Sequence, residues 1–300
     1  DVPFEKEGQY LKSDNRSNIS YFLEHNVLLR RFTLSVGVLA NYNSALNEGI
    51  HFYPGIDASY RIGDNFRLYG SWNRALRMPT FTDLYYEGKT NKGNPDLKPE
   101  ESEAFEVGLK YNTYFLRAHI AGFYRKGKNM IDWVKEKPED IWESQNLTKV
   151  DNLGFETNLS LLPRELGNER FFIRKIELGY AFIHQDKDSE GYISNYALDY
   201  LKHKFTAQLS HSIWKGFSAT WYVRWQDRAG SYTKYENLKP AYEEPYAPYC
   251  LVDMKVNWEY QRLNLYAELN NLLNSTYYDL GNIPQPGIWF KAGFRYSFKY

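Results

Sequence analysis

The 300-residue chain lacks long hydrophobic runs, since its apolar stretches end after about five residues, as in Val36–Ala40. A transmembrane helix needs about 17 to 25 consecutive apolar residues, so helical membrane spans are excluded. Cysteine is nearly absent, and the single Cys250 excludes an internal disulfide and a cysteine metal cluster. Neither sign of charge dominates, because 37 Lys and Arg balance 37 Asp and Glu. Nucleic acid is therefore not an expected partner.

Aromatic residues are abundant: 8 Trp, 27 Tyr and 18 Phe make up 18% of the chain. Segments of about ten residues alternate apolar with polar residues, the period of two typical of strands whose faces meet different surroundings. The clearest is 288–300, where Phe290 and Phe294 lie on one face and Lys291 and Arg295 on the other. This alternation predicts an all-β fold with one continuous apolar face.

The pattern predicts thirteen strands and no helix. Their connections alternate between very short turns, such as 63–65, 214–216 and 261–262, and loops of about ten to twenty-five residues. Short turns therefore gather at one end of the strands and long loops at the other. The predicted strands begin near Asn18, Phe32, His51, Phe66, Ser102, Phe115, Glu143, Phe171, Ala197, Phe217, Ala247, Leu263 and Gly287.

Two architectures accommodate so many antiparallel strands: a soluble propeller and a barrel in the bacterial outer membrane. A propeller requires a blade repeat of about 40 to 50 residues, which the sequence does not contain. A barrel requires an apolar face toward outer-membrane lipid, a polar face toward the lumen, aromatic girdles, and short turns opposite long loops. Because all four features are present, we predict a transmembrane antiparallel β-barrel.

The C-terminal aromatics on the apolar face are interpreted as the signal read by the barrel assembly machinery. They are Phe294, Tyr296, Phe298 and Tyr300. Placing this end in the periplasm puts the long loops outside the cell and makes residues 1–16 an extracellular loop. Thirteen is an odd number, whereas single-chain bacterial barrels have an even number of strands. We therefore expect residues 1–300 to be the C-terminal part of one barrel, without a second domain, completed by an upstream part.

The stretch Tyr69–Tyr85, followed by Gly93–Glu100, resembles the central signature of TonB-dependent outer-membrane receptors. In that family a strand ending in Arg-x-Pro leads into a loop that closes with Asn-Pro-x-Leu-x-Pro-Glu. The matching residues are Arg77, Pro79, Asn94, Pro95, Leu97, Pro99 and Glu100. Residues 152–156 and 269–278 resemble two further family segments. The alternative interpretation of the Asn-Pro and Lys-Pro pairs is a plain turn before a strand.

The resemblance implies a 22-stranded barrel, of which this chain supplies about thirteen strands. The upstream part of the receptor would carry the other strands, the plug that fills the lumen and the TonB box that contacts the TonB complex. Residues 78–86 are most similar to the vitamin B12 receptors of Bacteroidetes type. This similarity implies active import of cobalamin or another corrinoid, with a siderophore or haem receptor as the alternative. A passive porin or adhesion barrel is the alternative from another class.

No enzyme motif is present: there is no Gly-x-Ser-x-Gly, no His-Glu-x-x-His and no glycine-rich phosphate loop. We therefore predict no enzyme, no catalytic residue and no cofactor. Asp186, Asp188 and Glu190 together offer oxygen ligands for Ca²⁺, but a solvated acidic loop tip is the favoured interpretation, and we assign no metal site.

Aromatic side chains on outer loops combine apolar area with a polar tip, which suits capture of a bulky ligand or docking of a surface lipoprotein lid. The alternative for each is packing of loop on loop. The candidate ligand-binding residues are Arg77, Tyr85, Tyr86, Trp133, Trp142, Tyr192, Arg228, Tyr232, Tyr235 and Tyr242. The residues expected to face the lumen, and there a polar plug, are Arg67, Glu106, Lys110, Glu156, Lys204, Arg224, Asp253, Lys255, Glu268, Lys291 and Arg295.

Overall fold

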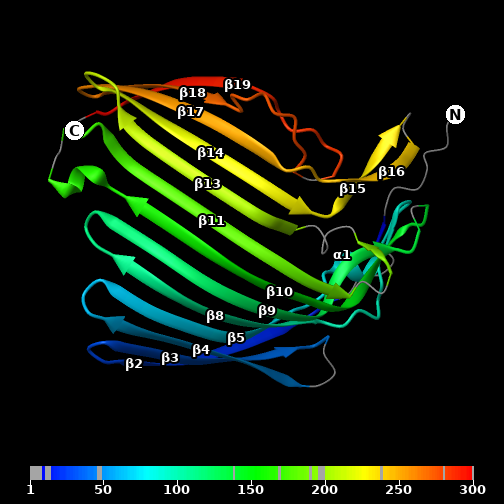
Figure 1. Ribbon diagram of the computed structural model, residues 1–300. Coiled ribbons are helices and arrows are strands. Elements are labelled where there is room, and N and C mark those ends of the chain that lie inside the picture. The colour runs from blue at the N-terminus through cyan, green and yellow to red at the C-terminus, as the bar shows by residue number, and fades with distance from the viewer. Residues whose placement is uncertain are drawn as a thin grey trace. The chain divides into compact units, whose positions relative to one another are not determined.

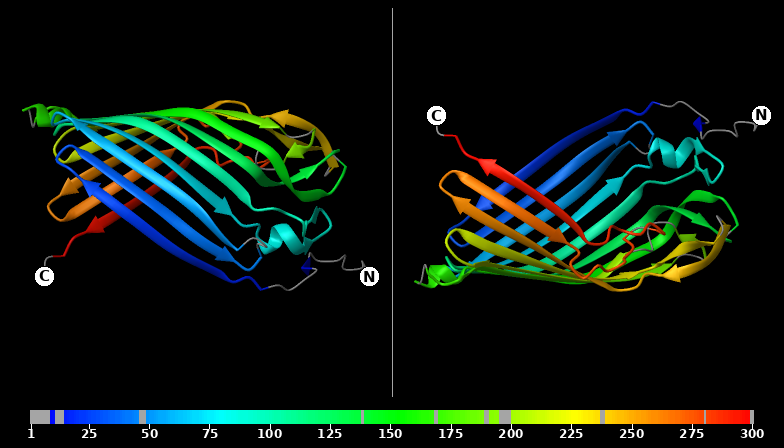
Figure 2. Two further views of the ribbon diagram at one scale, coloured as in Figure 1. Left: turned by 90° about the horizontal axis from the view of Figure 1, so that it is seen from below. Right: turned by 90° about the horizontal axis from the view of Figure 1, so that it is seen from above.

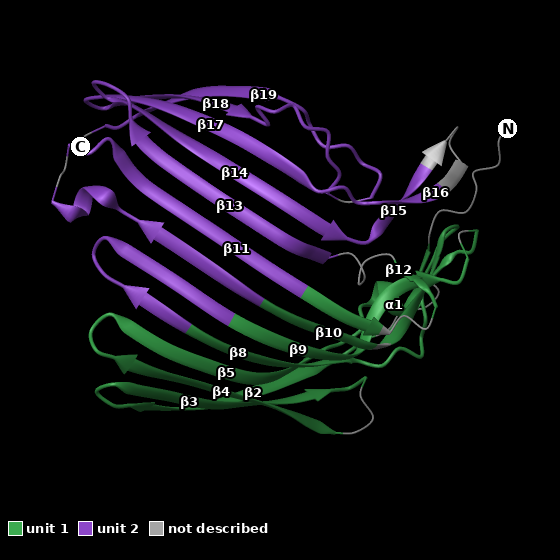
Figure 3. Ribbon diagram, in the orientation of Figure 1, with its two compact units in different colours: residues 1–108, 122–154, 184–199 green, residues 109–121, 155–183, 200–300 purple. Residues whose placement is uncertain are grey.

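The computed structural model describes most of the chain (Figure 1). The described residues are 9–10, 15–45, 49–137, 139–167, 170–188, 191–194, 200–236, 239–279 and 281–298. Two compact units divide the chain and are coloured separately in Figure 3. Unit 1 comprises residues 1–108, 122–154 and 184–199, and unit 2 comprises residues 109–121, 155–183 and 200–300. No described helix is long and apolar enough to cross a membrane.

Thirteen of the described strands have eight or more residues, and each begins within three residues of a predicted start. The predicted set of strands is therefore confirmed, although Ala197 itself lies outside the described residues. The long strands are β2 (Asn18–Leu28), β3 (Phe32–Asn43), β4 (Ile50–Ile62), β5 (Phe66–Arg77), β8 (Glu100–Asn112), β9 (Leu116–Lys135), β10 (Trp142–Leu161), β11 (Ile173–Asp188), β13 (Tyr200–Ser212), β14 (Phe217–Ala229), β17 (Tyr249–Tyr260), β18 (Leu263–Asn270) and β19 (Trp289–Tyr296).

Short elements decorate the loops between the long strands. They are β1 (Gln9–Tyr10), β6 (Tyr86–Glu87), β7 (Asn91–Lys92), β12 (Ile193–Ser194), β15 (Ser231–Glu236), β16 (Lys239–Pro245), the helix α1 (Phe81–Tyr85) and the 3₁₀ helix η1 (Pro163–Leu166). Strands β15 and β16 pair as a separate two-stranded sheet. Inside the predicted loop 1–16, β1 pairs with β6, while residues 1–8 and 11–14 lie outside the described residues.

Strands β2 to β5 of unit 1 form an antiparallel meander in chain order, visible in Figures 1 and 2. Successive side chains of a strand point to opposite faces. In β3, Val36 is accordingly exposed, whereas Asn41 and Asn43 on the other face are buried. Apolar side chains thus occupy the exposed face and polar side chains the covered one, the reverse of a soluble sheet.

In unit 2, β11, β13, β14, β17, β18 and β19 pair antiparallel in that order. The alternation predicted for the last strand is confirmed over its described part. Phe290 and Phe294 are 62% and 74% exposed. Lys291, one position along, reaches Glu268 on the opposite face at 3.8 Å. Of the predicted assembly signal, Phe298 is exposed and Tyr300 lies outside the described residues.

The short turns connect neighbouring strands where the sequence predicts them. Gly63 and Gly216 adopt φ values of 65° and 85°, which glycine takes without steric cost. Gln261, between β17 and β18, adopts φ 52°. These left-handed residues reverse the chain within a few positions and keep the paired strands in register.

Few large apolar side chains are buried. One small cluster in unit 1 consists of Val134, Leu147 and Val150, with Met130 and Tyr192 packed against it. Many other large apolar side chains along the strands are exposed. Such extensive apolar surface is unfavourable in water and suits contact with lipid chains.

The helix α1 differs from the prediction of no helix. Its start is fixed by a capping box: the Thr80 hydroxyl accepts a hydrogen bond from the Asp83 backbone N–H, and the Asp83 carboxylate accepts one from the Thr80 backbone N–H. Five residues are too few to produce a helical period in the sequence, which is why hydrophobic periodicity missed this element.

Candidate functional site

The family motif is organised around Arg77, at the end of β5, and Glu100, at the start of β8. The Arg77 Nε donates to Glu100 Oε2, and Nη2 donates to Oε1, both at 2.5 Å. Glu100 Oε1 also accepts the Ile131 backbone N–H at 2.7 Å. Arg77 Nη1 lies 3.9 Å from the carboxylate of Asp83 in α1. The motif therefore closes a loop over the ends of three strands.

The loop between these residues is held by its own backbone. The Gly93 N–H donates to the Tyr86 carbonyl at 2.6 Å, and the Asn94 N–H donates to the Asp83 carbonyl at 2.8 Å. A Cβ on Gly93 would lie 2.8 Å from the Leu84 carbonyl carbon, so only glycine permits this approach.

The other motif residues shape and anchor this loop. The Pro79 carbonyl accepts a hydrogen bond from Arg16 Nη1 at 2.7 Å. Asn94 Oδ1 accepts the Asp96 N–H at 2.9 Å, which forms an Asx turn at the Asn-Pro pair. The Lys98 backbone between Leu97 and Pro99 exchanges hydrogen bonds with the Asn146 side chain at 2.8 and 2.9 Å. The motif residues thus maintain the loop conformation.

Besides Arg77, the five candidate ligand residues of unit 1 lie in two groups. Tyr85 stacks on Phe81 with ring centroids 6.2 Å apart, and Tyr86 meets Tyr10 edge to face at 5.8 Å. The other three lie around the ends of β9 and β10, at Trp133, Trp142 and Tyr192.

The residues around the ends of β9 and β10 make a cation–aromatic contact, a packing contact with the apolar cluster, and hydrogen bonds. The Lys135 ammonium lies 4.5 Å from the Trp142 ring centroid. Tyr192 packs against the small apolar cluster, so its ring stabilises the loop. The Trp133 backbone N–H donates to its neighbour Asp132 at 2.8 Å, and Asp132 also binds Ser194 of β12.

In unit 2, Tyr232 forms the centre of a tyrosine cluster. It is only 6% exposed, and its ring lies 5.2 Å from Tyr246 and 5.0 Å from Tyr278. Two cations border this cluster: Arg228 lies 5.5 Å from the Tyr246 ring centroid, and Lys234 lies 5.7 Å from that of Tyr278. Tyrosine faces with cations above them form an amphipathic surface.

The electrostatics of the hairpin β15–β16 centre on Glu244. The Lys234 Nζ lies 2.8 Å from the Glu244 carboxylate, and the Tyr232 hydroxyl donates to the same carboxylate at 3.1 Å. The hydrogen bond from Lys234 lowers the pKa of Glu244, and the same bond raises the pKa of Lys234. Burial, followed by the hydrogen bond to Glu244, raises the pKa of Tyr232. The side chain of Tyr242 projects, 53% exposed, whereas that of Tyr235 lies outside the described residues.

The tyrosine cluster contains residues that the predicted ligand set does not include. Tyr278 and Glu244 contact Tyr232 directly. The Tyr249 hydroxyl donates to Asp279 and lies next to Tyr277, with ring centroids 4.6 Å apart. Sequence spacing does not reveal these contacts, because the residues come from three separate loops and strands. The sequence signals were their aromatic and acidic character and, for Tyr277 and Tyr278, the resemblance of residues 269–278 to a family segment.

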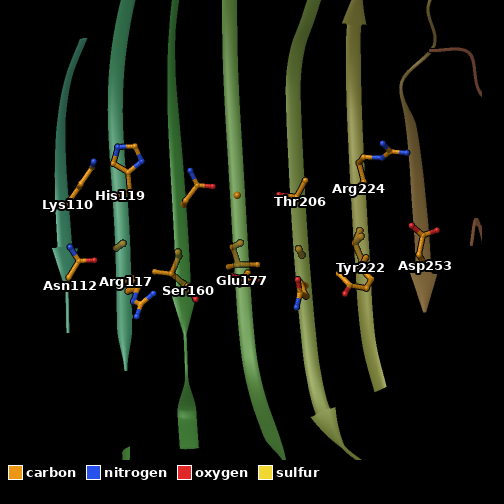
Figure 4. Close-up of a pocket in the computed structure, with 18 residues that line it drawn as sticks. Lys110, Asn112, Arg117, His119, Ser160, Glu177, Thr206, Tyr222, Arg224 and Asp253 are labelled. Carbon is orange, nitrogen blue, oxygen red and sulfur yellow. The ribbon is translucent and has the colours of Figure 1, made fainter. Parts of the chain in front are cut away.

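Two clefts lie on the polar face of unit 2, both lined by described residues. The first has a volume of about 640 Å³, and Figure 4 shows Lys110, Arg117, His119, Arg224 and Asp253 among the side chains that line it. Neighbouring His119 and Glu156 approach to 3.7 Å. Because these side chains project from successive strands onto one face, the predicted polar face is confirmed here.

The second cleft, of about 760 Å³, contains the predicted residues Lys255, Glu268, Lys291 and Arg295. Lys255 pairs with Glu268 at 2.7 Å. In unit 1, Glu106 accepts a hydrogen bond from the Tyr69 hydroxyl at 2.8 Å. Charges of both signs therefore line the polar face.

The acidic loop tip offers little support for Ca²⁺. Asp186 binds Lys149 Nζ at 2.7 Å, while the Asp188 side chain and Glu190 lie outside the described residues. In the described part of the chain, no three or more His, Cys, Asp and Glu side chains group so as to hold a metal ion.

Long antiparallel strands with an exposed apolar face and a charged polar face define a transmembrane β-barrel protein of the bacterial outer membrane. The family described as "TonB dependent receptor-like, beta-barrel" matches residues 3–272. The chain therefore belongs to the β-barrel family of TonB-dependent receptors, which are transport receptors.

Several characterised proteins resemble the chain. The vitamin B12 transporter BtuB of Vibrio vulnificus is 26% identical over 225 residues, covering 56% of this chain and 36% of that protein. The ferrienterobactin receptor of Escherichia coli is 22% identical over 297 residues, covering 89% and 38%. A mutant ferric enterobactin receptor of Pseudomonas aeruginosa, solved with enterobactin, superposes with a TM-score of 0.74 at 19% identity, covering 94% and 46%. The chain thus spans less than half the length of these relatives.

Proposed function

We propose that this chain is part of an outer-membrane receptor that binds a scarce, bulky nutrient at its extracellular loops and imports it with energy supplied by TonB. Cobalamin or another corrinoid is the favoured nutrient. Membership of the receptor family and the similarity to the B12 transporter of Vibrio vulnificus support this proposal. The proposed function includes no covalent chemistry.

The observation that carries the proposal is the tyrosine cluster of unit 2. Rings of Tyr232, Tyr246 and Tyr278 pack together, and Arg228 and Lys234 border them. Ligand sites combine a predominantly apolar wall with a few placed polar groups. A corrinoid has a broad ring and a rim of amide groups, which match aromatic faces and hydroxyl or cationic groups respectively.

A ferric siderophore or haem is the second candidate nutrient. The two cations over the tyrosine rings favour it, because such ligands carry negative charge. The similarity to enterobactin receptors supports the same alternative.

The proposed partners follow from the polar face. An upstream part of the same receptor would supply a plug, and the mixed charges of both clefts suit contact with a polar protein surface. Through its TonB box that part would contact the TonB complex. A surface lipoprotein over the loops, outer-membrane lipid and the barrel assembly machinery complete the set. A passive porin or adhesion barrel would need no plug and remains the alternative class.

The test uses the intact receptor that contains this chain, purified in detergent and titrated with cyanocobalamin, ferric enterobactin and haemin. We expect cyanocobalamin to bind, and Arg228→Gln and Tyr242→Ala to weaken binding by about tenfold, a loss typical of contact residues. Tyr114→Ala is the matched control, because Tyr114 is an exposed tyrosine at a short turn. Binding of ferric enterobactin or haemin alone would select the second candidate. No binding together with open conductance in planar bilayers would select the passive porin.

A further inference from the structure

An aromatic row crosses three neighbouring strands of unit 1 on the apolar face. Trp72 of β5 lies 6.4 Å from Phe105 of β8, and Phe105 lies 6.5 Å from Tyr124 of β9, measured between ring centroids. Phe105 and Tyr124 are exposed. In outer-membrane barrels such aromatic girdles mark the boundary between lipid chains and headgroups. This row therefore locates that boundary at the long-loop end of the strands.

A charged row follows the aromatic row on the same face. Two residues further along each strand, toward the long loops, Trp72 is succeeded by Arg74, Phe105 by Glu103 and Tyr124 by Lys126. A step of two residues preserves the face and advances about 7 Å along a strand. The charged row thus lies at headgroup depth, directly beyond the apolar band.

The charged row forms a small cleft of about 50 Å³. Its lining residues are Arg74, Glu101, Ser102, Glu103, Lys126 and Lys128. Arg74 lies 3.4 Å from Glu103 and 3.7 Å from Glu101, so it neutralises part of the acidic charge. Lys126 and Lys128 are exposed, and neither has an ion-pair partner within the described part of the chain. Three cations against two anions leave the cleft positive.

The neighbouring charges do not consume these lysines. On β10, Lys149 binds Asp186 at 2.7 Å and lies 3.6 Å from Asp151. Asp151 also accepts the Tyr124 hydroxyl at 2.9 Å. Asp151 and Asp186 are therefore already engaged by Lys149 and Tyr124. The unbalanced positive charge stays at Lys126 and Lys128.

We propose that this basic cleft binds a phosphate group of a membrane glycolipid in the leaflet that surrounds the long-loop end of the strands. The acyl chains would lie along Trp72, Phe105 and Tyr124, while Lys126 and Lys128 hold the phosphate. Both contacts belong to one lipid molecule, because the two rows are adjacent on the same face. Basic clusters beside a lipid-facing surface recognise anionic headgroups in this way.

The test titrates the intact receptor, in detergent, with diphosphoryl lipid A and follows bound lipid by native mass spectrometry. We expect K126Q/K128Q to weaken binding by about tenfold or more, since two cations beside an anionic headgroup are lost. The control K92Q/K98Q removes the same charge from two exposed loop lysines of unit 1 and should change binding less than twofold. Fully dephosphorylated lipid A should bind the unaltered receptor as weakly as lipid A binds K126Q/K128Q. Circular dichroism checks that each variant is folded.

Three results would overturn the proposal. If K126Q/K128Q and K92Q/K98Q bound lipid A with equal affinity, Lys126 and Lys128 would not be part of the binding site. Complete displacement of lipid A by millimolar inorganic phosphate would indicate a general anion site. If EDTA abolished lipid A binding and the lysine substitutions did not affect it, the lipid would instead be held through a divalent cation at Glu101 and Glu103.

Discussion

Arg77 and Glu100 join the end of one strand to the start of the next through two parallel hydrogen bonds of 2.5 Å each. The same carboxylate accepts the backbone N–H of Ile131, so it also positions β9. A planar guanidinium makes both bonds at once, and lysine does not. The family motif thereby places this pair where the loop 78–99 leaves and re-enters the sheet.

The substitution Arg77→Lys should loosen that loop. Losing one charge-assisted hydrogen bond corresponds to about 1.5 kcal/mol of local stability, or about tenfold faster opening. Limited proteolysis of the intact receptor, with cleavage sites mapped by mass spectrometry, measures this as faster cutting within 78–99. Arg67→Lys, in the same strand, is the control. Equal cleavage rates in both variants would contradict a closing role for Arg77.

Gly93→Ala should displace α1 from the loop. The added Cβ would lie 2.8 Å from the Leu84 carbonyl carbon and 2.9 Å from the Asp83 carbonyl oxygen, and backbone atoms cannot yield as a flexible side chain does. Hydrogen exchange should therefore quicken at the Asn94 amide, which donates to Asp83. Gly122→Ala, where a Cβ meets nothing nearer than 3.9 Å, should leave exchange unchanged.

Tyr232→Ala should destabilise the tyrosine cluster far more than Tyr232→Phe. Truncation of a buried aromatic side chain costs about 3–5 kcal/mol, whereas removal of the hydroxyl alone costs about 1 kcal/mol for its hydrogen bond. Amide exchange in 231–236 and 239–245 reports the difference. If both variants exchange alike, the Tyr232 ring does not hold the hairpin.

Acid should loosen the same hairpin. The pKa of Glu244 is lowered from 4.5 by its bond from Lys234, so its contribution is present above that value and is lost as the pH falls through the lowered pKa. The pKa of Lys234 is raised from 10.5, so its contribution is present below that value and is lost only as the pH rises through the raised pKa. Protection factors of the hairpin amides should therefore stay level from about pH 5 to 8 and fall below about pH 4.

Glu244→Gln supplies the control for this pH dependence. The amide does not titrate, so the protection factors of its hairpin should be lower at neutral pH and should change little on acidification. An acid-induced loss of protection as large in Glu244→Gln as in the unaltered receptor would assign the effect to another group.

The strands could be predicted because the residue pattern that specifies each one lies within a short stretch of sequence. Alternation of residues such as Phe290 and Lys291 fixes the two faces, and turn residues such as Gly63 and Gly216 fix the strand ends. The resemblance located Arg77 and Glu100 in one motif. Their mutual pairing required the structure, because 22 residues separate them in the chain.

Other features escaped prediction for physical reasons. The helix α1 rests on a capping box at Thr80 and Asp83, a short-range signal that a search for long periods passes over. The tyrosine cluster joins Tyr232 to Tyr278 across a long stretch of chain, and composition alone does not say which aromatic residues meet. Predicted ligand residues such as Trp133 and Tyr242 stay predictions, since binding is what would test them.

Strands β9 and β10 each have twenty residues, about twice the length that a tilted strand needs to cross the hydrocarbon core. Each strand therefore passes through two environments, the lipid of the membrane and the loops beyond it. In β9, Ile120 is exposed in the half that begins at the short turn, while Val134 is buried in the half that ends at the long loop. Substitutions in the first half of β9 therefore act on its contact with lipid, and substitutions in the second half act on its packing with neighbouring loops.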